Sequence, residues 1–185
     1  MKLVPTASQT VGPYFCIGLD HLCAKSISEA QNGTTVHGRV LDANSEPVPD
    51  AMLELWYADS SGDYGGADGD GHPSGFARVI TDDEGRFGFT IGRPGAVPYD
   101  DTRIQAPHVE VCCFARGLLR HLITRMYFPD ESANGTDPLL QSLTEDRRAT
   151  LIARRQSPGA DTLRAEALEW NIVLQGEDET VFFAW

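Results

Sequence analysis

Two residues able to bind a metal or transfer a proton stand two positions apart in the segment APHVEV (residues 106–111), namely His108 and Glu110. In an extended strand, residues i and i+2 point to the same face, so this imidazole and this carboxylate would lie side by side. Together with the phenol of Tyr64 they form a candidate ligand set for a hard cation such as Fe(III). A His and a Glu on one strand face are more often a hydrogen-bonded pair, and the residues alone leave both interpretations open.

The elements that must position these residues are short strands with alternating apolar side chains. One clear alternation is Phe87, Phe89 and Ile91, which follows the hairpin turn DDEG. Further strands are predicted from Val36 to Val40, in HVEVCCFA (108–115), in HLITRMYF (121–128) and from Leu168 to Leu174. Many short strands separated by turns predict an all-β fold, an antiparallel β-sandwich.

One late stretch is predicted to be helical. Leu139, Leu143 and Leu151 recur near helical spacing between Pro138 and Arg155. Asp137 precedes them and is a candidate N-cap. The first 33 residues show little periodicity and are expected to form an irregular N-terminal segment.

The bulk composition favours one domain and excludes some partners. A chain of 185 residues can bury its own core, so we expect 1–185 to form a single domain with 1–33 as an arm. The net charge of -12 argues against nucleic acid and anionic membranes as partners. The first residues, MKLVPTASQT, lack the apolar core of a signal peptide, and no apolar run approaches a membrane span, which favours a cytoplasmic protein.

Motifs along nearly the whole chain resemble those of the intradiol ring-cleaving dioxygenases, in particular the alpha chains of the protocatechuate 3,4-dioxygenase group. They appear in family order, and together they are far more specific than any one of them. The motifs are SQTVGPYF (8–15), HGRVLD (37–42), PVPDAMLELWYAD (47–59), GDY (62–64), RPG (93–95), APHVEV (106–111), FARG (114–117), HLITRMYF (121–128), RRATLIARR (147–155) and QGEDETVFF (175–183).

The resemblance implies that the candidate ligand set is vestigial. In the family's beta chains, two tyrosines and a His-x-His pair hold Fe(III). Tyr64 matches the first tyrosine and His108 the first histidine, but Val97 stands at the second tyrosine and Glu110 at the second histidine. Gln105 replaces an arginine that acts on the substrate. The expectation is an iron-free chain, with Fe(III) bound by a homologous beta chain in a hetero-oligomer.

The resemblance also implies a role for this chain in binding the substrate of its partner. By analogy, the N-terminal residues Thr10, Gly12, Pro13 and Tyr14 would line the partner's pocket, and Arg116 would bind the aromatic acid. Glycine permits close approach of a ligand to the backbone, and arginine is suited to a carboxylate. The implied reaction is cleavage of protocatechuate (3,4-dihydroxybenzoate) by O2 to 3-carboxy-cis,cis-muconate, in the beta-ketoadipate pathway of aromatic catabolism.

Two other functions are compatible with the sequence. The chain could bind iron itself through Tyr64, His108 and Glu110 and act as a stand-alone dioxygenase. Alternatively, it could be a non-enzymatic β-sandwich binding module that retains the scaffold without the chemistry. Iron content and tyrosinate-to-iron colour of the isolated chain distinguish the first alternative from an alpha-type subunit, and a neighbouring gene for an iron-binding chain would argue against the second.

Overall fold

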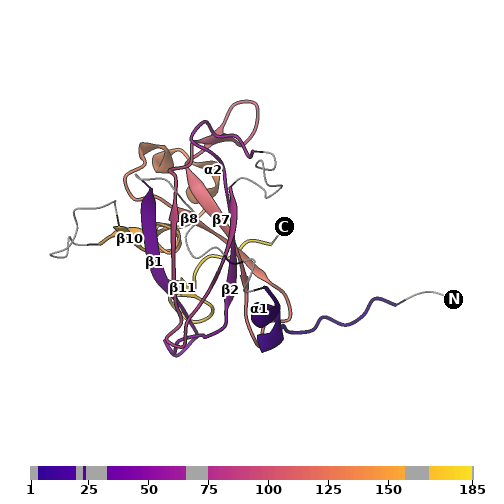
Figure 1. Ribbon diagram of the computed structural model, residues 1–185. Coiled ribbons are helices and arrows are strands. Elements are labelled where there is room, and N and C mark those ends of the chain that lie inside the picture. Colours follow the sequence, from indigo (N-terminus) through magenta and orange to yellow (C-terminus); the bar gives the residue numbers. More distant parts are fainter. Residues whose placement is uncertain (1–3, 20–22, 24–32, 66–74, 157–166, 185) are drawn as a thin grey trace.

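The computed structural model describes residues 4–19, 23, 33–65, 75–156 and 167–184. Within these residues the chain forms two β-sheets that contribute to one apolar core, together with short helices and a small separate hairpin (Figure 1). The predicted all-β sandwich is confirmed. The second sheet and the hairpin carry the candidate site.

The first sheet is built on β1 (Thr34–Leu41), whose two edges carry different partners. β4 (Arg86–Ile91) pairs antiparallel with one edge, whereas β10 (Ala167–Glu169) and β11 (Ile172–Val173) run parallel to β1 along the other. β9 (Arg154–Arg155) extends the sheet beyond β10. These two parallel pairings depart from the predicted antiparallel arrangement, because alternation along a sequence does not reveal the direction in which strands pair.

The second sheet is antiparallel throughout, in the strand order β3–β2–β7–β8. Its strands are β2 (Met52–Tyr57), β3 (Phe76–Ile80), β7 (His108–Phe114) and β8 (Leu122–Tyr127). Val109, Val111 and Cys113 of β7 belong to the core. Because side chains alternate along a strand, His108 and Glu110 both lie on the outer face of this sheet, as predicted.

A two-stranded hairpin lies in the chain between β4 and β7. It consists of β5 (Val97–Pro98) and β6 (Ile104–Gln105), with Val97 directly opposite Gln105. Gln105 is separated from His108 by only two residues, so the hairpin brings its own side chains to the start of β7.

The predicted helix from Pro138 to Arg155 is wrong as a single element. The chain forms η2 (Ser132–Gly135), α2 (Pro138–Gln141) and α3 (Glu145–Ala149) instead, and then becomes extended. Leu151 and Ala153 exchange backbone hydrogen bonds with Tyr127 at the end of β8, so strand pairing overrides the helical periodicity. The predicted N-cap is confirmed, because the Asp137 carboxylate accepts hydrogen bonds from the first amides of α2. No helix among the described residues has the length and hydrophobicity that a bilayer span would require.

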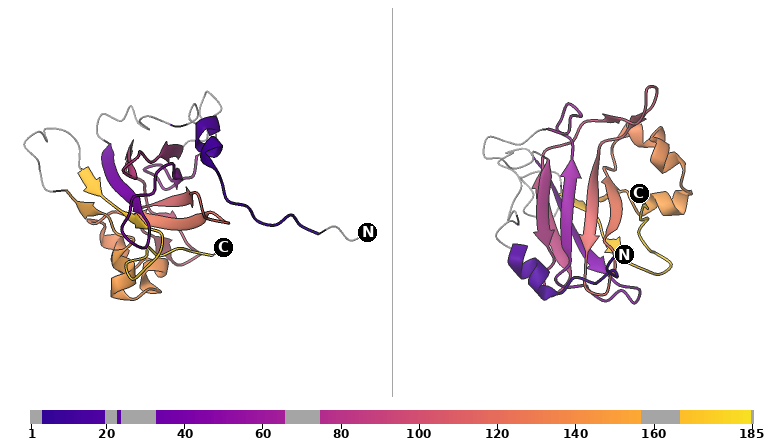
Figure 2. Two further views of the ribbon diagram at one scale, coloured as in Figure 1. Left: turned by 90° about the horizontal axis from the view of Figure 1, so that it is seen from below. Right: turned by 90° about the vertical axis from the view of Figure 1, so that its right-hand side faces the viewer.

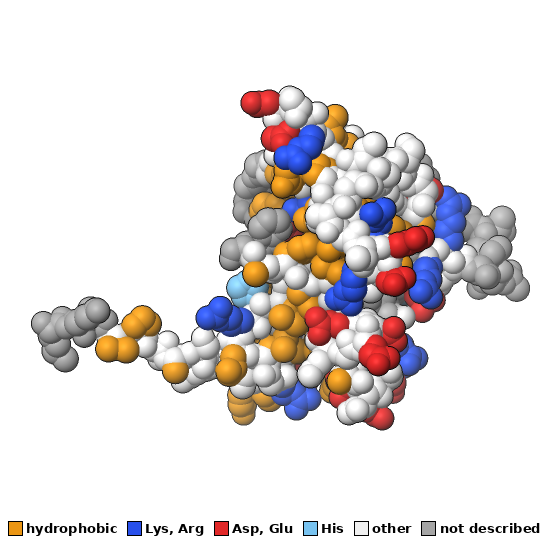
Figure 3. All heavy atoms as spheres, turned by 180° about the vertical axis from the view of Figure 1, so that it is seen from behind, with side chains coloured by type: hydrophobic (Ala, Val, Ile, Leu, Met, Phe, Trp, Pro, Cys, Tyr) orange, Lys and Arg blue, Asp and Glu red, His pale blue; other side chains and the backbone are white. Residues whose placement is uncertain are grey.

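The N-terminal segment is only partly irregular. Residues 4–12 extend away from the sandwich (Figures 1 and 2), and the helix α1 (Pro13–Leu19) follows them. Proline is favourable at the first position of a helix, since its missing N–H would have no partner there. Phe15 packs against Phe114 of β7, with ring centroids 5.5 Å apart, and Cys16 is buried. Figure 3 shows the projecting arm, with apolar side chains along it, from the opposite side of the molecule.

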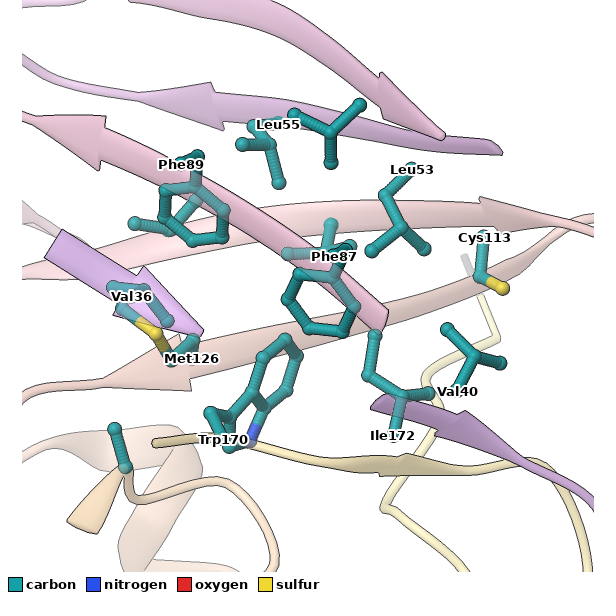
Figure 4. Packing of buried hydrophobic residues seen from close by; sticks show 14 of the residues in the cluster. Val36, Val40, Leu53, Leu55, Phe87, Phe89, Cys113, Met126, Trp170 and Ile172 are labelled. Carbon is teal, nitrogen blue, oxygen red and sulfur yellow. The ribbon is translucent and has the colours of Figure 1, made fainter. Parts of the chain in front are cut away.

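The core lies between the two sheets and is closed by side chains from both. Phe87 and Phe89 of β4 stack on each other, with ring centroids 6.3 Å apart. Leu53 and Leu55 of β2 lie across from them, and Trp170 packs at the side (Figure 4). Burial of this apolar surface is the dominant stabilising contribution, and it fixes the second sheet against the first. The outer face of that sheet is thereby available for polar side chains.

Candidate functional site

The register of β7 and β8 places four side chains of the candidate site opposite one another. His108 pairs with Tyr127, and Glu110 pairs with Arg125. Directly opposite side chains in an antiparallel pair are close enough to interact. The sequence predicted the first strand's pair but not the second strand's contribution.

His108 is a buried, neutral imidazole. Its Nδ1 lies 2.7 Å from the carbonyl oxygen of Ala106, so Nδ1–H donates to that carbonyl and Nε2 carries the free lone pair. Burial, together with the nearby positive charge of Arg125, lowers the pKa of His108 to about 4, although the Ala106 hydrogen bond acts in the opposite direction. At neutral pH this side chain is therefore a hydrogen-bond acceptor at Nε2.

Tyr64 comes from the segment that follows β2 and reaches the same imidazole. Its hydroxyl lies 3.4 Å from Nε2 of His108, and its ring stacks on Trp56, with centroids 6.4 Å apart. Partial burial raises the pKa of Tyr64, while the charge of Arg125 opposes the rise and that of Glu110 adds to it. The structure thus brings together Tyr64 and His108, two members of the candidate ligand set, with the phenol protonated at neutral pH.

Arg125 lies at the centre of the cluster. One terminal nitrogen donates to Oε1 of Gln105 at 2.5 Å, and the other lies 3.3 Å from Oε2 of Glu110. Only 9% of the Arg125 side chain is exposed, against 31% of the Glu110 side chain. Sequence reasoning missed this residue. The alternation of HLITRMYF puts Arg125 and Tyr127 on one face of their strand, but it does not give the register that places Arg125 opposite Glu110.

The hairpin contributes an apolar residue and an amide to the site. Val97 is almost completely buried and offers no donor atom. Gln105 holds its place by donating to the carbonyl of Pro98 at 3.1 Å while its oxygen accepts from Arg125. Two of the three residues that depart from the beta-chain pattern, Val97 and Gln105, therefore lie beside the cluster.

Asp137 is fully buried and binds the backbone of Ala106, next to the cluster. Its carboxylate accepts from the backbone amide of Ala106 at 2.8 Å and from the amides of Leu139 and Leu140 at 2.9 Å each. The hydroxyl of Tyr127 lies 3.4 Å from the same carboxylate. This one side chain joins the N-terminus of α2 to the residue whose carbonyl orients His108. The sequence predicted its capping role but not this second one.

A second candidate region surrounds Arg116, at the opposite end of β7. The Arg116 side chain is 52% exposed and lies 3.6 Å from a carboxylate oxygen of Asp50. The hydroxyl of Thr10 accepts a hydrogen bond from the amide of Gly117 at 2.7 Å. The thiol of Cys16 in turn donates to the carbonyl of Asp50 at 2.8 Å. The arm and α1 are thus each attached to the segment that carries Arg116.

The remaining predicted residues of the arm lie open to solvent. Tyr14 is 84% exposed, and a side chain at Gly12 would meet nothing within 4 Å. A shallow pocket of about 200 Å³ lies beside this region. It is lined by Gln9, Val11, Phe114, Ala115, Leu118, Leu119, Arg120 and His121. The structure brings Thr10 to the loop of Arg116, whereas Tyr14 points into solvent.

Comparisons with known proteins agree with these features. Residues 12–176 match a protein-family model described as "Dioxygenase". The chain belongs to the intradiol dioxygenase family. It is 39% identical to the protocatechuate 3,4-dioxygenase alpha chain of Burkholderia cepacia, over 98% of each chain. It is also 33% identical to the beta chain from the same organism, over 78% of this chain and 65% of that one. A solved structure, the dioxygenase domain of a carbohydrate-binding fusion from Streptomyces sp. SirexAA-E, has a TM-score of 0.60 and 25% identity over 83% of this chain and 88% of that one.

The intradiol dioxygenases depend on Fe(III), but the residues described here do not fit that ion. A ferric site needs several hard, anionic donors, and valine at position 97 supplies none. Glu110 is already engaged by Arg125, whose positive charge also acts on Tyr64 and His108. In the described part of the chain, no three His, Cys, Asp or Glu side chains group closely enough to hold a metal. The described side chains of the cluster thus form an ion-paired assembly around Arg125.

Proposed function

We propose that this chain is the alpha, iron-free subunit of a heteromeric Fe(III) dioxygenase that cleaves protocatechuate with O2 to 3-carboxy-cis,cis-muconate. The ferric ion is bound by a homologous beta chain, and the two chains together form the enzyme. The near full-length similarity to an alpha chain and the additional similarity to a beta chain support this assembly. Its place is in aromatic catabolism, in the beta-ketoadipate pathway.

The observation that carries the proposal is the ion pair between Arg125 and Glu110 within the candidate ligand set. A carboxylate that neutralises a buried guanidinium cannot at the same time neutralise a ferric ion without leaving the guanidinium unpaired, which is strongly unfavourable. With Val97 at the position of the second phenolate, Tyr64 and His108 are the members of the candidate set that are not ion-paired. The iron chemistry then belongs to the partner.

The contribution of this chain to catalysis lies in the arm. Thr10, Gly12, Pro13 and Tyr14 line the partner's pocket, and Arg116 binds the carboxylate of the aromatic acid. The exposure of Tyr14 and of the Arg116 side chain supports this role, because both remain available to a second molecule. A guanidinium is well suited to a carboxylate, since it can donate two parallel hydrogen bonds.

The test is to measure iron content and visible absorption of this chain purified alone and after co-expression with the beta chain. We expect the isolated chain to be colourless and free of iron, and the complex to be coloured, with one iron per alpha–beta pair and ring-cleaving activity. A coloured, iron-loaded single chain would instead establish the stand-alone dioxygenase. Failure to form a complex with any iron-binding chain would leave the binding module as the better description.

A further inference from the structure

The guanidinium of Arg125 lies among the very side chains that could otherwise hold a metal. It donates to Gln105, pairs with Glu110 and exerts its charge on Tyr64 and His108. It is also almost completely buried, so water screens its charge only weakly. Three candidate ligands and one amide therefore surround a single positive charge that the protein itself supplies.

We propose that Arg125 is the resident cation of this site, and that its guanidinium, in addition to the loss of ligands, excludes metal ions from it. A metal ion bound by Tyr64, His108 and Glu110 would face a second positive charge in a region of low dielectric constant, where repulsion is strong. Moving the guanidinium aside would break its hydrogen bonds inside the protein. This inference rests on the proposed function and adds the reason why the chain stays iron-free.

A second arginine pair on the same sheet provides the internal comparison. Arg78 of β3 and Glu54 of β2 are also directly opposite, and their atoms lie 2.7 Å apart. Both side chains are 23% exposed. The Arg78 guanidinium also lies over the ring of Phe76, 4.8 Å from its centroid. This pair shares the cross-strand geometry of Arg125 and Glu110 but is not surrounded by Tyr64 and His108, so it serves as a matched control.

The experiment compares the full-length wild type with Arg125→Met and with Arg78→Met by titration with Fe(III) citrate. Binding is followed by calorimetry and by the absorption band that a tyrosinate–iron contact produces. We expect Arg125→Met to bind the ion at least about tenfold more tightly than the wild type, which corresponds to about 1.4 kcal/mol. The control Arg78→Met should bind no better than the wild type. Equal binding by Arg125→Met and the wild type would overturn the proposal.

A second variant tests the proposal if Arg125→Met does not fold. Glu110→His restores a His-x-His pair but leaves the guanidinium in place, so the resident cation should still exclude Fe(III). Tight binding by Glu110→His would show that ligand loss alone had emptied the family's site, and would overturn the role of Arg125. The same titrations separate this idea from the proposed function. Assembly and activity of the wild-type complex report on the subunit assignment, whereas metal affinity of the single-chain variants reports on Arg125.

Discussion

Arg125 and Arg116 are attached to the same pair of strands and the connection between them, yet their surroundings are opposite. Arg125 lies on the outer face of the second sheet, but only 9% of its side chain is exposed. Its guanidinium is hydrogen-bonded to Gln105 and paired with Glu110 of the same chain. Arg116 lies at the far end of β7, with 52% of its side chain exposed and one carboxylate at 3.6 Å. The charge of Arg125 is neutralised within the chain by Glu110, whereas the more exposed guanidinium of Arg116 is accessible from solvent.

The difference shows how one scaffold can separate structure from recognition. A buried charge must be paired and hydrogen-bonded to be tolerated, and Arg125 is paired with Glu110 and hydrogen-bonded to Gln105. An exposed ion pair contributes little to stability, so the environment of Arg116 is free to change when a ligand arrives. Substitutions in the closed cluster of Tyr64, His108, Glu110 and Arg125 should therefore act on stability, whereas those in the open region of Arg116 and the arm should act on substrate affinity.

The largest expected effect concerns the closed cluster and its dependence on pH. The pKa of His108 is lowered to about 4 in the folded protein, whereas an unperturbed histidine titrates near 6.5. Its contribution to stability is therefore complete above about pH 6.5 and is lost as the pH falls toward 4, because the unfolded chain binds the proton more readily. Between pH 7.5 and 4.5 the loss from this group amounts to about 2–3 kcal/mol.

Urea unfolding of the wild type and of His108→Gln at these two pH values measures that contribution. The wild type also loses stability through carboxylates with lowered pKa, such as Asp130, so the relevant quantity is the difference between the two proteins. His37→Gln is the matched control, since His37 lies on the exposed face of β1. If the free energy of unfolding changed equally with pH in the wild type and in His108→Gln, the lowered pKa of His108 in the folded protein would be disproved.

The next effect belongs to the open region. Replacement of Arg116 by Ala should raise the KM of the assembled enzyme for the aromatic acid by about 10–50-fold, as expected for loss of about 1.5–2.5 kcal/mol of charge-assisted hydrogen bonding. Iron content and the unfolding temperature should hardly change, because the Arg116–Asp50 pair is exposed. Steady-state kinetics of the complex provide the measurement.

Arg120→Ala is the control for this substitution, since it removes another positive charge from the same connection. It lines the shallow pocket beside the arm and lies outside the set of residues assigned to the substrate in the proposed assembly. An unchanged KM for Arg116→Ala, or an equal rise for both variants, would remove Arg116 from the substrate site. The region around Arg116 would then have a structural role only, like the closed cluster.

The sequence was sufficient for features that depend on local pattern. Alternation identified β7 and therefore the common face of His108 and Glu110, and the type and position of Asp137 identified a helix N-cap. Features that depend on pairing between distant segments were not accessible in this way. Arg125 meets Glu110 only because β7 and β8 adopt one particular register, which a single strand's pattern does not specify.

The helix that was predicted through residue 155 failed for the same reason. Leu139, Leu143 and Leu151 recur near helical spacing, but the backbone amide of Tyr127 donates to the carbonyl of Leu151, which holds this part of the chain beside β8. Local propensity is weak compared with such tertiary pairing.

The prediction for Thr10 was also incomplete. The sequence and the family resemblance suggested a place on a pocket wall, and the structure adds a hydrogen bond to the amide of Gly117.

The smallest expected effect tests that hydrogen bond. Thr10→Val keeps the shape of the side chain but cannot accept from Gly117, which should cost about 1 kcal/mol of local stability. The arm would then be held less firmly beside Arg116, and the KM of the complex should rise by about threefold to fivefold. Thr10→Ser retains the hydroxyl and should restore both the KM and slow hydrogen exchange at the Gly117 amide. Because Thr10 is exposed, the overall unfolding temperature should stay the same in both variants. Faster exchange at the Gly117 amide without any change in KM would mean that the position of the arm does not affect substrate binding by Arg116. The open region would then not depend on the hydrogen bond between Thr10 and Gly117.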